Sequence, residues 1–280
     1  MSVELPEAYI LAGQMNRELR GRKVAEFSLQ NHEKLQRLGF VNRDATAFKG
    51  LVGGRVESVV TRGNVMRVKL DNGLNLILAP EYGGTILFHG GNSGIPEKFH
   101  LRLHFTDGSQ LTVTLTGMGI IQALKDEELE QSYVYRRDFS ATSSPMNEAE
   151  FTFERFSDEI ASRNVNIKPA LVGKDAAIVG LSNSAFQDIL FRAGIHPKRK
   201  ASSLTEKERR ALYNAIGQVI QARIKAGGKS QFVDLYGRQG NYTPFMGPNM
   251  KDKACTVCGA KVEKLGLGGG QVFFCPKCQI

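Results

Sequence analysis

Four cysteines near the C-terminus constrain the fold more than any other feature of this sequence. They form the pattern Cys255-x2-Cys258-x16-Cys275-x2-Cys278, and they are the only cysteines in the chain. Two CxxC pairs joined by about 15–20 residues can present four thiolates to one zinc ion in tetrahedral geometry. The alternatives are two disulfides, which are rare in the cytosol, and a redox CxxC, which needs a βαβ context that is lacking here. We therefore predict one Zn²⁺ ion, and because four thiolates leave no open coordination position, its role is structural.

The size and composition of the chain are typical of a globular protein with about two domains. The chain has 280 residues, of which 41% are hydrophobic and 23% are charged, and domains of this size bury their own cores. No run of 18 or more apolar residues could span a bilayer, and no apolar segment of a secretory signal follows the N-terminus. We expect a monomer in a bacterial-type cytoplasm, where it can associate with the nucleoid, and no membrane partner.

Positive charge is concentrated in the last third of the chain. Residues 191–280 contain 16 Lys and Arg against five Asp and Glu, whereas residues 1–190 contain 21 against 23. A face with this excess favours phosphate ligands, because each neutralised phosphate releases condensed counterions. A solvated basic surface that only aids solubility is the alternative. A membrane surface is disfavoured, because no amphipathic basic helix carries aromatic anchors.

Hydrophobic periodicity predicts an α+β protein with several domains. Helical spacing of apolar residues begins directly after Pro6, and short alternating runs between about 22 and 135 are typical of an antiparallel sandwich. Three helical patterns follow, over 150–164, 183–194 and 204–228. We expect a β-sandwich flanked by helices over 1–137, a linker over 138–150, a helical domain over 151–240 and a zinc finger over 241–280.

The order of these parts resembles the formamidopyrimidine-DNA glycosylase / endonuclease VIII family. The resemblance is carried by the stretches "ELPE", "IVGLSNSAFQDILFRAGIHP", "YGRQG" and "CPKCQ", which together extend over nearly the whole chain. It implies a β-sandwich domain, a helix–two-turns–helix domain and a four-cysteine finger. It also implies a DNA repair enzyme that flips a damaged base out of duplex DNA, removes it and cleaves the abasic strand.

The resemblance implies a nucleophile at the N-terminus, and this sequence departs from the family there. Usual members lose the initiator Met and expose a Pro, which is followed by Glu and whose amine forms a Schiff base with C1′ of the sugar. Here Val3 occupies the Pro position, Ser2 precedes it and Glu4 follows it. If only Met1 is removed, the free amine belongs to Ser2, up to ~3.5 Å from the usual position. If Ser2 is removed as well, Val3 supplies a primary amine, as the N-terminal Val of some eukaryotic relatives does. Glu4, Ser2 and Val3 are therefore the candidate catalytic residues, and Glu4 has the alternative of complementing the N-terminus of a helix.

Other positions where the family contacts DNA are also altered. A phosphate-binding lysine of the family falls at Asn64, and an arginine of the finger falls at Gly270. The segment that supplies an Arg and a Phe corresponds to "LTGMGI", with Met118 and Gly119. The loop that carries a gap-filling Met aligns with "PEYGGT" and places Tyr82 there, either as a stacking wedge or as an ordinary loop aromatic.

The remaining candidates for nucleic-acid binding lie in the basic part of the chain. Asn183, at the head of a predicted helix, either contacts a phosphate or caps the helix. The basic candidates are Lys198, Arg199, Lys200, Lys261 and Lys264. We predict a protein that binds damaged or abasic duplex DNA, either as a glycosylase and abasic-site lyase with an altered nucleophile or as a binder that has lost catalysis. The alternative ligand of the same basic face is structured RNA.

Overall fold

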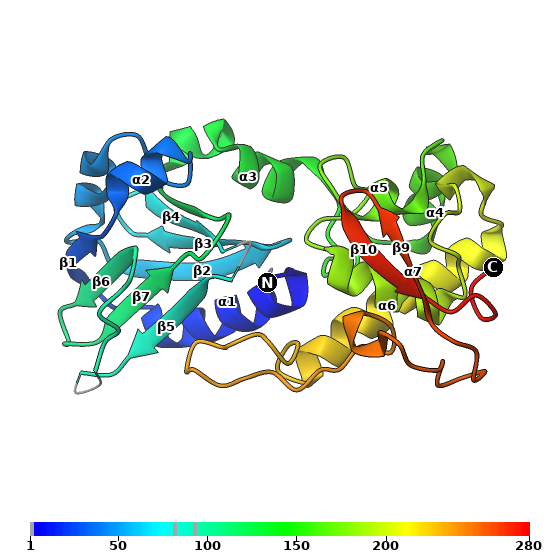
Figure 1. The fold of residues 1–280 in the computed structure, drawn as a ribbon. Coiled ribbons are helices and arrows are strands. Elements are labelled where there is room, and N and C mark those ends of the chain that lie inside the picture. Colours follow the sequence, from blue (N-terminus) through cyan, green and yellow to red (C-terminus); the bar gives the residue numbers. More distant parts are fainter. Residues whose placement is uncertain (1–2, 81–82, 92–93) are drawn as a thin grey trace. The chain divides into compact units, whose positions relative to one another are not determined.

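The chain folds into two compact units, each of which is described by itself. The structure is a computed structural model that describes residues 3–80, 83–91 and 94–280. Unit 1 comprises Met1–Ala141 and Ala226–Asn241, and unit 2 comprises Thr142–Lys225 and Tyr242–Ile280 (Figure 1). The predicted domains follow one another along the chain, whereas this packing is discontinuous, because a segment that follows the longest helix joins unit 1.

Unit 1 is built around two four-stranded antiparallel sheets. The first has the order β1-β6-β7-β5 and contains β1 (Val24–Leu29), β6 (Leu101–Phe105), β7 (Gln110–Thr114) and β5 (Thr85–His89). The second has the order β2-β3-β4-β8 and contains β2 (Val56–Arg62), β3 (Val65–Leu70), β4 (Leu74–Ala79) and β8 (Ile120–Lys125). One hydrophobic core takes side chains from both sheets, as in a sandwich. The predicted β-sandwich is confirmed.

Strand β4 is buried along its whole length, and all of its residues except Asn75 are apolar in the sequence "LNLILA". Leu76 and Leu78 point into the sandwich core. Ile77 and Ala79 point to the opposite face, where they pack in a second cluster with Leu129, Val134 and Tyr135. Successive side chains of a strand alternate between faces, so a strand with two covered faces loses the apolar–polar alternation. The buried Asn75 is hydrogen-bonded to the Leu124 carbonyl and to Asp126.

Short helices cover the outer face of this second sheet. Figure 1 shows α3 (Tyr133–Tyr135) above β4, and η2 (Asp126–Gln131) and η3 (Arg136–Ala141) flank it in the chain. The other short helices of the unit are α2 (His32–Arg37) and η1 (Ala45–Leu51). No helix in the part of the chain that the structure describes is both long and apolar enough to cross a membrane.

Helix α1 (Leu5–Leu19) packs against β2 with the face that periodicity predicts. Its apolar positions Ala8, Leu11, Ala12, Met15 and Leu19 are all buried. Glu4 is the N-cap residue, Pro6 lies in the first turn, and Glu4 and Glu7 form a capping box. The Glu4 backbone amide donates to the Glu7 carboxylate at 3.2 Å. This box holds the first residues of the chain against the sandwich.

The segment 226–241 belongs to unit 1 because hydrogen bonds fasten it to α1 and to β5. Asp234 accepts from the Gln14 side-chain amide at 2.8 Å, and the Leu235 amide donates to the same Gln14 side chain at 3.0 Å. The Leu235 carbonyl in turn accepts from the Phe88 amide at 2.9 Å. Phe232 and Leu235 enter the sandwich core. The segment is therefore an integral part of the β-rich unit.

Unit 2 combines helices with one hairpin. Its helices are α4 (Phe153–Ser162), α5 (Ile167–Leu171), α6 (Asn183–Ala193), α7 (Glu206–Lys225), η4 (Ala201–Ser203) and η5 (Pro248–Met250). The hairpin consists of β9 (Glu263–Leu267) and β10 (Gly270–Phe274). Gly268 and Gly269 connect its strands with positive φ angles of 52° and 74°, as a two-residue turn of this type requires. Helices α6 and α7 pack on each other, and α6 ends at Gly194 in the left-handed conformation.

Candidate functional site

The four cysteines converge at one point of unit 2. Their Sγ atoms all lie within 4.8 Å of one another, with 3.9 Å between Cys255 and Cys278 and 3.4 Å between Cys258 and Cys275. Four sulfurs at ~2.3 Å from a tetrahedral ion are separated by about 3.8 Å, so these thiols fit zinc. A hydrogen bond from the Ala260 backbone amide, with further bonds from the neighbouring thiols, lowers the pKa of the Cys258 thiol to about 7. This cluster can therefore hold a metal ion.

The finger is fastened to helix α6 by hydrogen bonds along its length. The Gln187 side chain accepts from the Phe273 amide at 2.7 Å, and the Gln279 side chain donates to the Ile195 carbonyl at 3.0 Å. Phe191 of α6 packs in one hydrophobic cluster with Val262, Phe273 and other residues of the finger. These hydrogen bonds and this cluster fix how the hairpin lies on the helix.

A lysine and an asparagine meet the tip of the hairpin at the N-terminus of α6. Lys168 of α5 is only 6% exposed, and its Nζ donates to the Leu267 carbonyl at 2.6 Å. Asn183 Nδ2 donates to the Gln271 carbonyl at 2.8 Å. A Cβ atom on Gly270 would lie 3.5 Å from Lys168 Nζ and 3.7 Å from Asn183 Nδ2. The two side chains therefore reach the position where the resemblance places an arginine.

Lys168 and Asn183 form a candidate anion site beside the N-terminus of α6. Burial lowers the pKa of the Lys168 ammonium, and in the described part of the chain Lys168 forms no ion pair. Among the described residues, Asn183 Oδ1 is buried without a hydrogen-bond partner. Ser182, not Asn183, is the N-cap of α6, since its hydroxyl accepts from the Ser184 amide at 3.4 Å. The capping alternative for Asn183 is therefore wrong. Its side chain donates a hydrogen bond to the hairpin instead.

The Arg137 guanidinium lies beside Asn64, the position where the family resemblance places a phosphate-binding lysine. Arg137 donates to the Asn64 Oδ1 atom at 2.9 Å, and Asp138 accepts from the Asn64 backbone amide at 3.1 Å. Asp138 is fully buried and also pairs with Arg137. The turn between β2 and β3 therefore carries a guanidinium group supplied by a later segment of the same unit.

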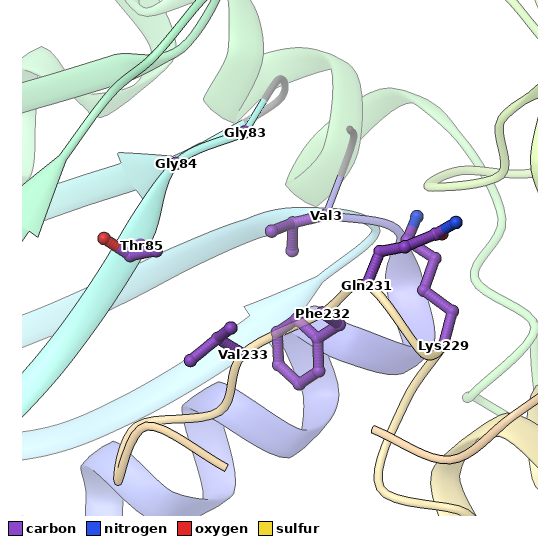
Figure 2. Close-up of a pocket in the computed structure, with 8 residues that line it drawn as sticks. All are labelled: Val3, Gly83, Gly84, Thr85, Lys229, Gln231, Phe232 and Val233. Atoms are coloured by element: carbon purple, nitrogen blue, oxygen red, sulfur yellow. The ribbon is translucent and has the colours of Figure 1, made fainter. Parts of the chain in front are cut away.

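Val3 lines a pocket of about 260 Å³ in unit 1. Figure 2 shows its lining residues, which are Val3, Gly83, Gly84, Thr85, Lys229, Gln231, Phe232 and Val233. Val3 is 5% exposed and Glu4 only 1%, so both predicted catalytic positions lie in the protein interior beside this pocket. Ser2 lies outside the described residues, as does Tyr82.

Lys229 brings an ammonium group to the same place. Its Nζ lies 3.8 Å from Glu4 Oε2, and the side chains of the two residues are 7% and 1% exposed. Its backbone amide donates to Glu7 Oε1 at 3.2 Å. Glu7, which is fully buried, therefore joins the start of α1 to the segment that carries Lys229.

The basic residues predicted to bind nucleic acid have different environments. Lys198, Lys200, Lys261 and Lys264 are exposed. Arg199 is half-buried and donates to both carboxylate oxygens of Glu208, at 2.8 Å and 3.2 Å. Arg199 thus fastens its loop to the first turn of α7.

Lys168, Lys229, Arg137 and Glu7 were not among the residues predicted from the sequence. Glu7 lies in the quoted "ELPE" stretch, and Lys229 follows the Gly227–Gly228 pair, which indicates only the end of a helix. For Lys168 and Arg137 no local pattern marks a site. Each becomes part of one through a partner that is distant in the sequence.

The fold, the finger and the buried start of α1 together define a class of two-unit proteins, and comparison with known proteins identifies it. Residues 3–116 match the model of the formamidopyrimidine-DNA glycosylase N-terminal domain, and residues 143–234 match that of the formamidopyrimidine-DNA glycosylase H2TH domain. The formamidopyrimidine-DNA glycosylase of Bacillus licheniformis is 30% identical over 237 residues, which cover 82% of each chain. That of Brevibacillus brevis is 28% identical and covers 99% of this chain and 98% of its own. The chain belongs to the formamidopyrimidine-DNA glycosylase family, and the predicted resemblance is confirmed.

Solved structures have the same fold. The Lactococcus lactis Fpg in complex with DNA containing an abasic site superposes with a TM-score of 0.83 at 21% identity and covers 99% of both chains. A complex of the wild-type L. lactis protein with DNA containing N7-benzyl-Fapy-dG also has a TM-score of 0.83, at 22% identity. These similarities confirm the predicted architecture of β-sandwich and helix–two-turns–helix.

Proposed function

We propose that this protein binds duplex DNA that carries a damaged or abasic site. The observation that carries the proposal is the anion site of Lys168 and Asn183 at the N-terminus of α6, within the helix–two-turns–helix domain. A helix N-terminus with a buried cation beside it is suited to a phosphate group. The family relationship supports DNA as the source of that phosphate, since the L. lactis neighbours were solved with abasic or damaged DNA.

Two cations that the family resemblance implies are replaced from elsewhere in the chain. Gly270 lacks the arginine of the finger, and Lys168 approaches its position within unit 2. Asn64 lacks the lysine of the β2–β3 turn, and Arg137 donates to it within unit 1. Because Arg137 is also paired with the buried Asp138, the Lys168 replacement is the one that supports retained contact with phosphates rather than loss of DNA binding.

A zinc ion held by Cys255, Cys258, Cys275 and Cys278 is part of this proposal. The sulfur separations fit a tetrahedral ion, and the four thiolates close its coordination sphere. The ion would fix the hairpin, whose carbonyl groups position both Lys168 and Asn183. Its contribution to DNA binding would therefore be indirect, through the anion site.

Lys168→Met is expected to weaken binding of duplex DNA without destabilising the fold. Loss of one charge-assisted hydrogen bond to a phosphate costs about 1.5–3 kcal/mol, which corresponds to roughly 10–100-fold in affinity. The slope of log K against log salt should also fall by about one. Fluorescence anisotropy at several salt concentrations measures both quantities. Lys174→Met, at an exposed position of the same unit, is the matched control, and an unchanged salt slope in Lys168→Met would remove Lys168 from the interface.

The preferred ligand is expected to be duplex DNA with an abasic-site analogue. Flipping a nucleotide that lacks a base avoids a few kcal/mol of unstacking and unpairing, so we expect it to bind about tenfold or more tightly than undamaged duplex. Competition with undamaged duplex and structured RNA measures the preference. The alternative of an RNA ligand has no support among the comparisons, and a preference for RNA would overturn the proposed function.

A further inference from the structure

We propose that Lys229 supplies the amine nucleophile for cleavage at abasic sites, in the pocket beside Val3. The inference rests on the proposed function, because the abasic strand must first be bound. It goes further by assigning a reaction and a reacting atom to this chain.

The Lys229 ammonium lies beside the Glu4 carboxylate, which can act as its base. Its Nζ lies 3.8 Å from Glu4 Oε2, and both side chains are more than nine-tenths buried. Figure 2 shows the Lys229 side chain extended among the residues that line the pocket. A separation of 3.8 Å is longer than a hydrogen bond, but such contacts are often loose before substrate binds.

The backbone around Lys229 is held firmly. Its amide donates to Glu7, and Phe232, three residues later, is buried in the sandwich core. Gly240 lies so close that a Cβ atom there would be 2.6 Å from the Lys229 carbonyl oxygen. A nucleophile on a fixed backbone loses little freedom when it is oriented for attack.

Val3 occupies the position of the family's nucleophile, and Ser2 precedes it in the sequence. While the Ser2–Val3 peptide bond is intact, the Val3 nitrogen is an amide, whose lone pair is delocalised into the carbonyl group and does not attack aldehydes. Lys229 is the one lysine among the lining residues of the pocket that the structure describes. Its side chain reaches the carboxylate of Glu4, the catalytic position that the sequence retains.

The proposed reaction begins with formation of a Schiff base. Glu4 takes a proton from the Lys229 ammonium, and the free amine attacks C1′ of the ring-opened abasic sugar to form a carbinolamine. The protonated Glu4 returns the proton to the carbinolamine hydroxyl, which leaves as water, and a protonated imine remains between Nζ and C1′. No oxidant or metal takes part in these steps.

Strand cleavage follows from the protonated imine. A base removes a proton from C2′, and the electron pair then expels the 3′ phosphate as the C3′–O bond breaks. Water hydrolyses the imine, which returns the Lys229 amine and leaves an unsaturated aldehyde on the cleaved strand. Glu4, which has by then lost its proton, is the group of this pocket that can accept the C2′ proton.

Borohydride trapping of the full-length protein on abasic duplex DNA tests this assignment. Borohydride reduces the imine to a stable amine, and digestion with nuclease and chymotrypsin followed by mass spectrometry locates the adduct. We expect it on the peptide that contains Lys229. An adduct on the N-terminal amine would overturn the proposal. Absence of any adduct would also overturn it, and the anisotropy measurement of DNA binding then shows whether the proposed function survives.

Substitutions of Lys229 distinguish a role as the nucleophile from a role as the structural ion-pair partner of Glu4. Lys229→Arg keeps the positive charge beside Glu4 but has no nucleophilic amine, and we expect its trapping rate to fall about 100-fold or more. Its DNA affinity and melting temperature should stay close to those of the parent protein. Lys34→Arg, on an exposed site of α2, is the matched control and should trap normally. Normal trapping by both Lys229→Arg and Lys229→Gln would exclude Lys229 as the nucleophile.

Discussion

Cys275→Ser is expected to release the finger from helix α6 and to abolish high-affinity binding of duplex DNA. Cys275 is fully buried, and the site that it completes fits one zinc ion. Structural zinc contributes about 10–16 kcal/mol in small metal-dependent modules, so a site with three thiolates should no longer hold the hairpin. Lys168 and Asn183 would then lose their carbonyl partners at Leu267 and Gln271.

Three measurements check this prediction. Metal analysis should find one zinc ion per parent chain and less in Cys275→Ser, and hydrogen exchange over 251–280 should become fast. DNA affinity should fall by about 10–100-fold or more, because at least one charge-assisted phosphate contact is lost. A strong chelator should reproduce these effects in the parent protein, and added zinc should reverse them.

The matched control for this experiment is Val257→Ser. Val257 lies between Cys255 and Cys258 and is 72% exposed, so its replacement changes the finger without removing a ligand. We expect its metal content and DNA affinity to remain those of the parent. If Cys275→Ser bound DNA as tightly as Val257→Ser, the finger would have no part in positioning the anion site.

Asp188→Ala is expected to destabilise unit 2 by about 3–5 kcal/mol, the usual cost of breaking a buried polar network. Asp188 is fully buried on α6, and its carboxylate accepts from the Phe245 and Met246 amides at 2.8 Å and 3.3 Å. It also accepts from the Tyr242 hydroxyl. Burial, with the Asp188 hydrogen bond, raises the pKa of Tyr242 to about 12, so this donor stays protonated at physiological pH.

The cost arises because Asp188→Ala leaves buried donors without acceptors. It also frees the chain that leads from α7 into the finger, since Met246 belongs to the cluster that packs under the metal site. Urea denaturation should show a lower midpoint, and hydrogen exchange at 242–250 should accelerate. Asp158→Ala, on the exposed face of α4, should change the free energy of unfolding by no more than about 0.5 kcal/mol. Equal midpoints for the two variants would contradict a central role for Asp188.

Much of the fold follows from local patterns. The apolar spacing after Pro6 predicts the buried face of α1, and the alternating runs predict the sandwich strands, because both reflect which side chains leave water. Strand β4 was harder to interpret, since cover on both faces removes the alternation. The membership of segment 226–241 in unit 1 could not be predicted, because it depends on hydrogen bonds to Gln14, more than 200 residues away.

Some residues of the candidate sites could be predicted from the sequence, and others could not. Spacing alone identifies the four metal ligands, because two CxxC pairs carry their geometry within a few residues each. Glu4 comes instead from the family resemblance, which is carried in part by the "ELPE" stretch at the helix start. Lys168 and Lys229 carry no such signal, since a lysine in a sequence is typical of a solvated surface.

The sequence by itself determined the family, the metal-binding pattern and the departure from the usual nucleophile at Val3. Only the tertiary structure decided which distant side chains lie beside these positions. It brings Lys168 to Gly270, Arg137 to Asn64 and Lys229 to Glu4. The physical reason is that periodicity and motif spacing report local backbone geometry and burial, whereas the value of a charge depends on the groups that folding brings within a few ångströms of it.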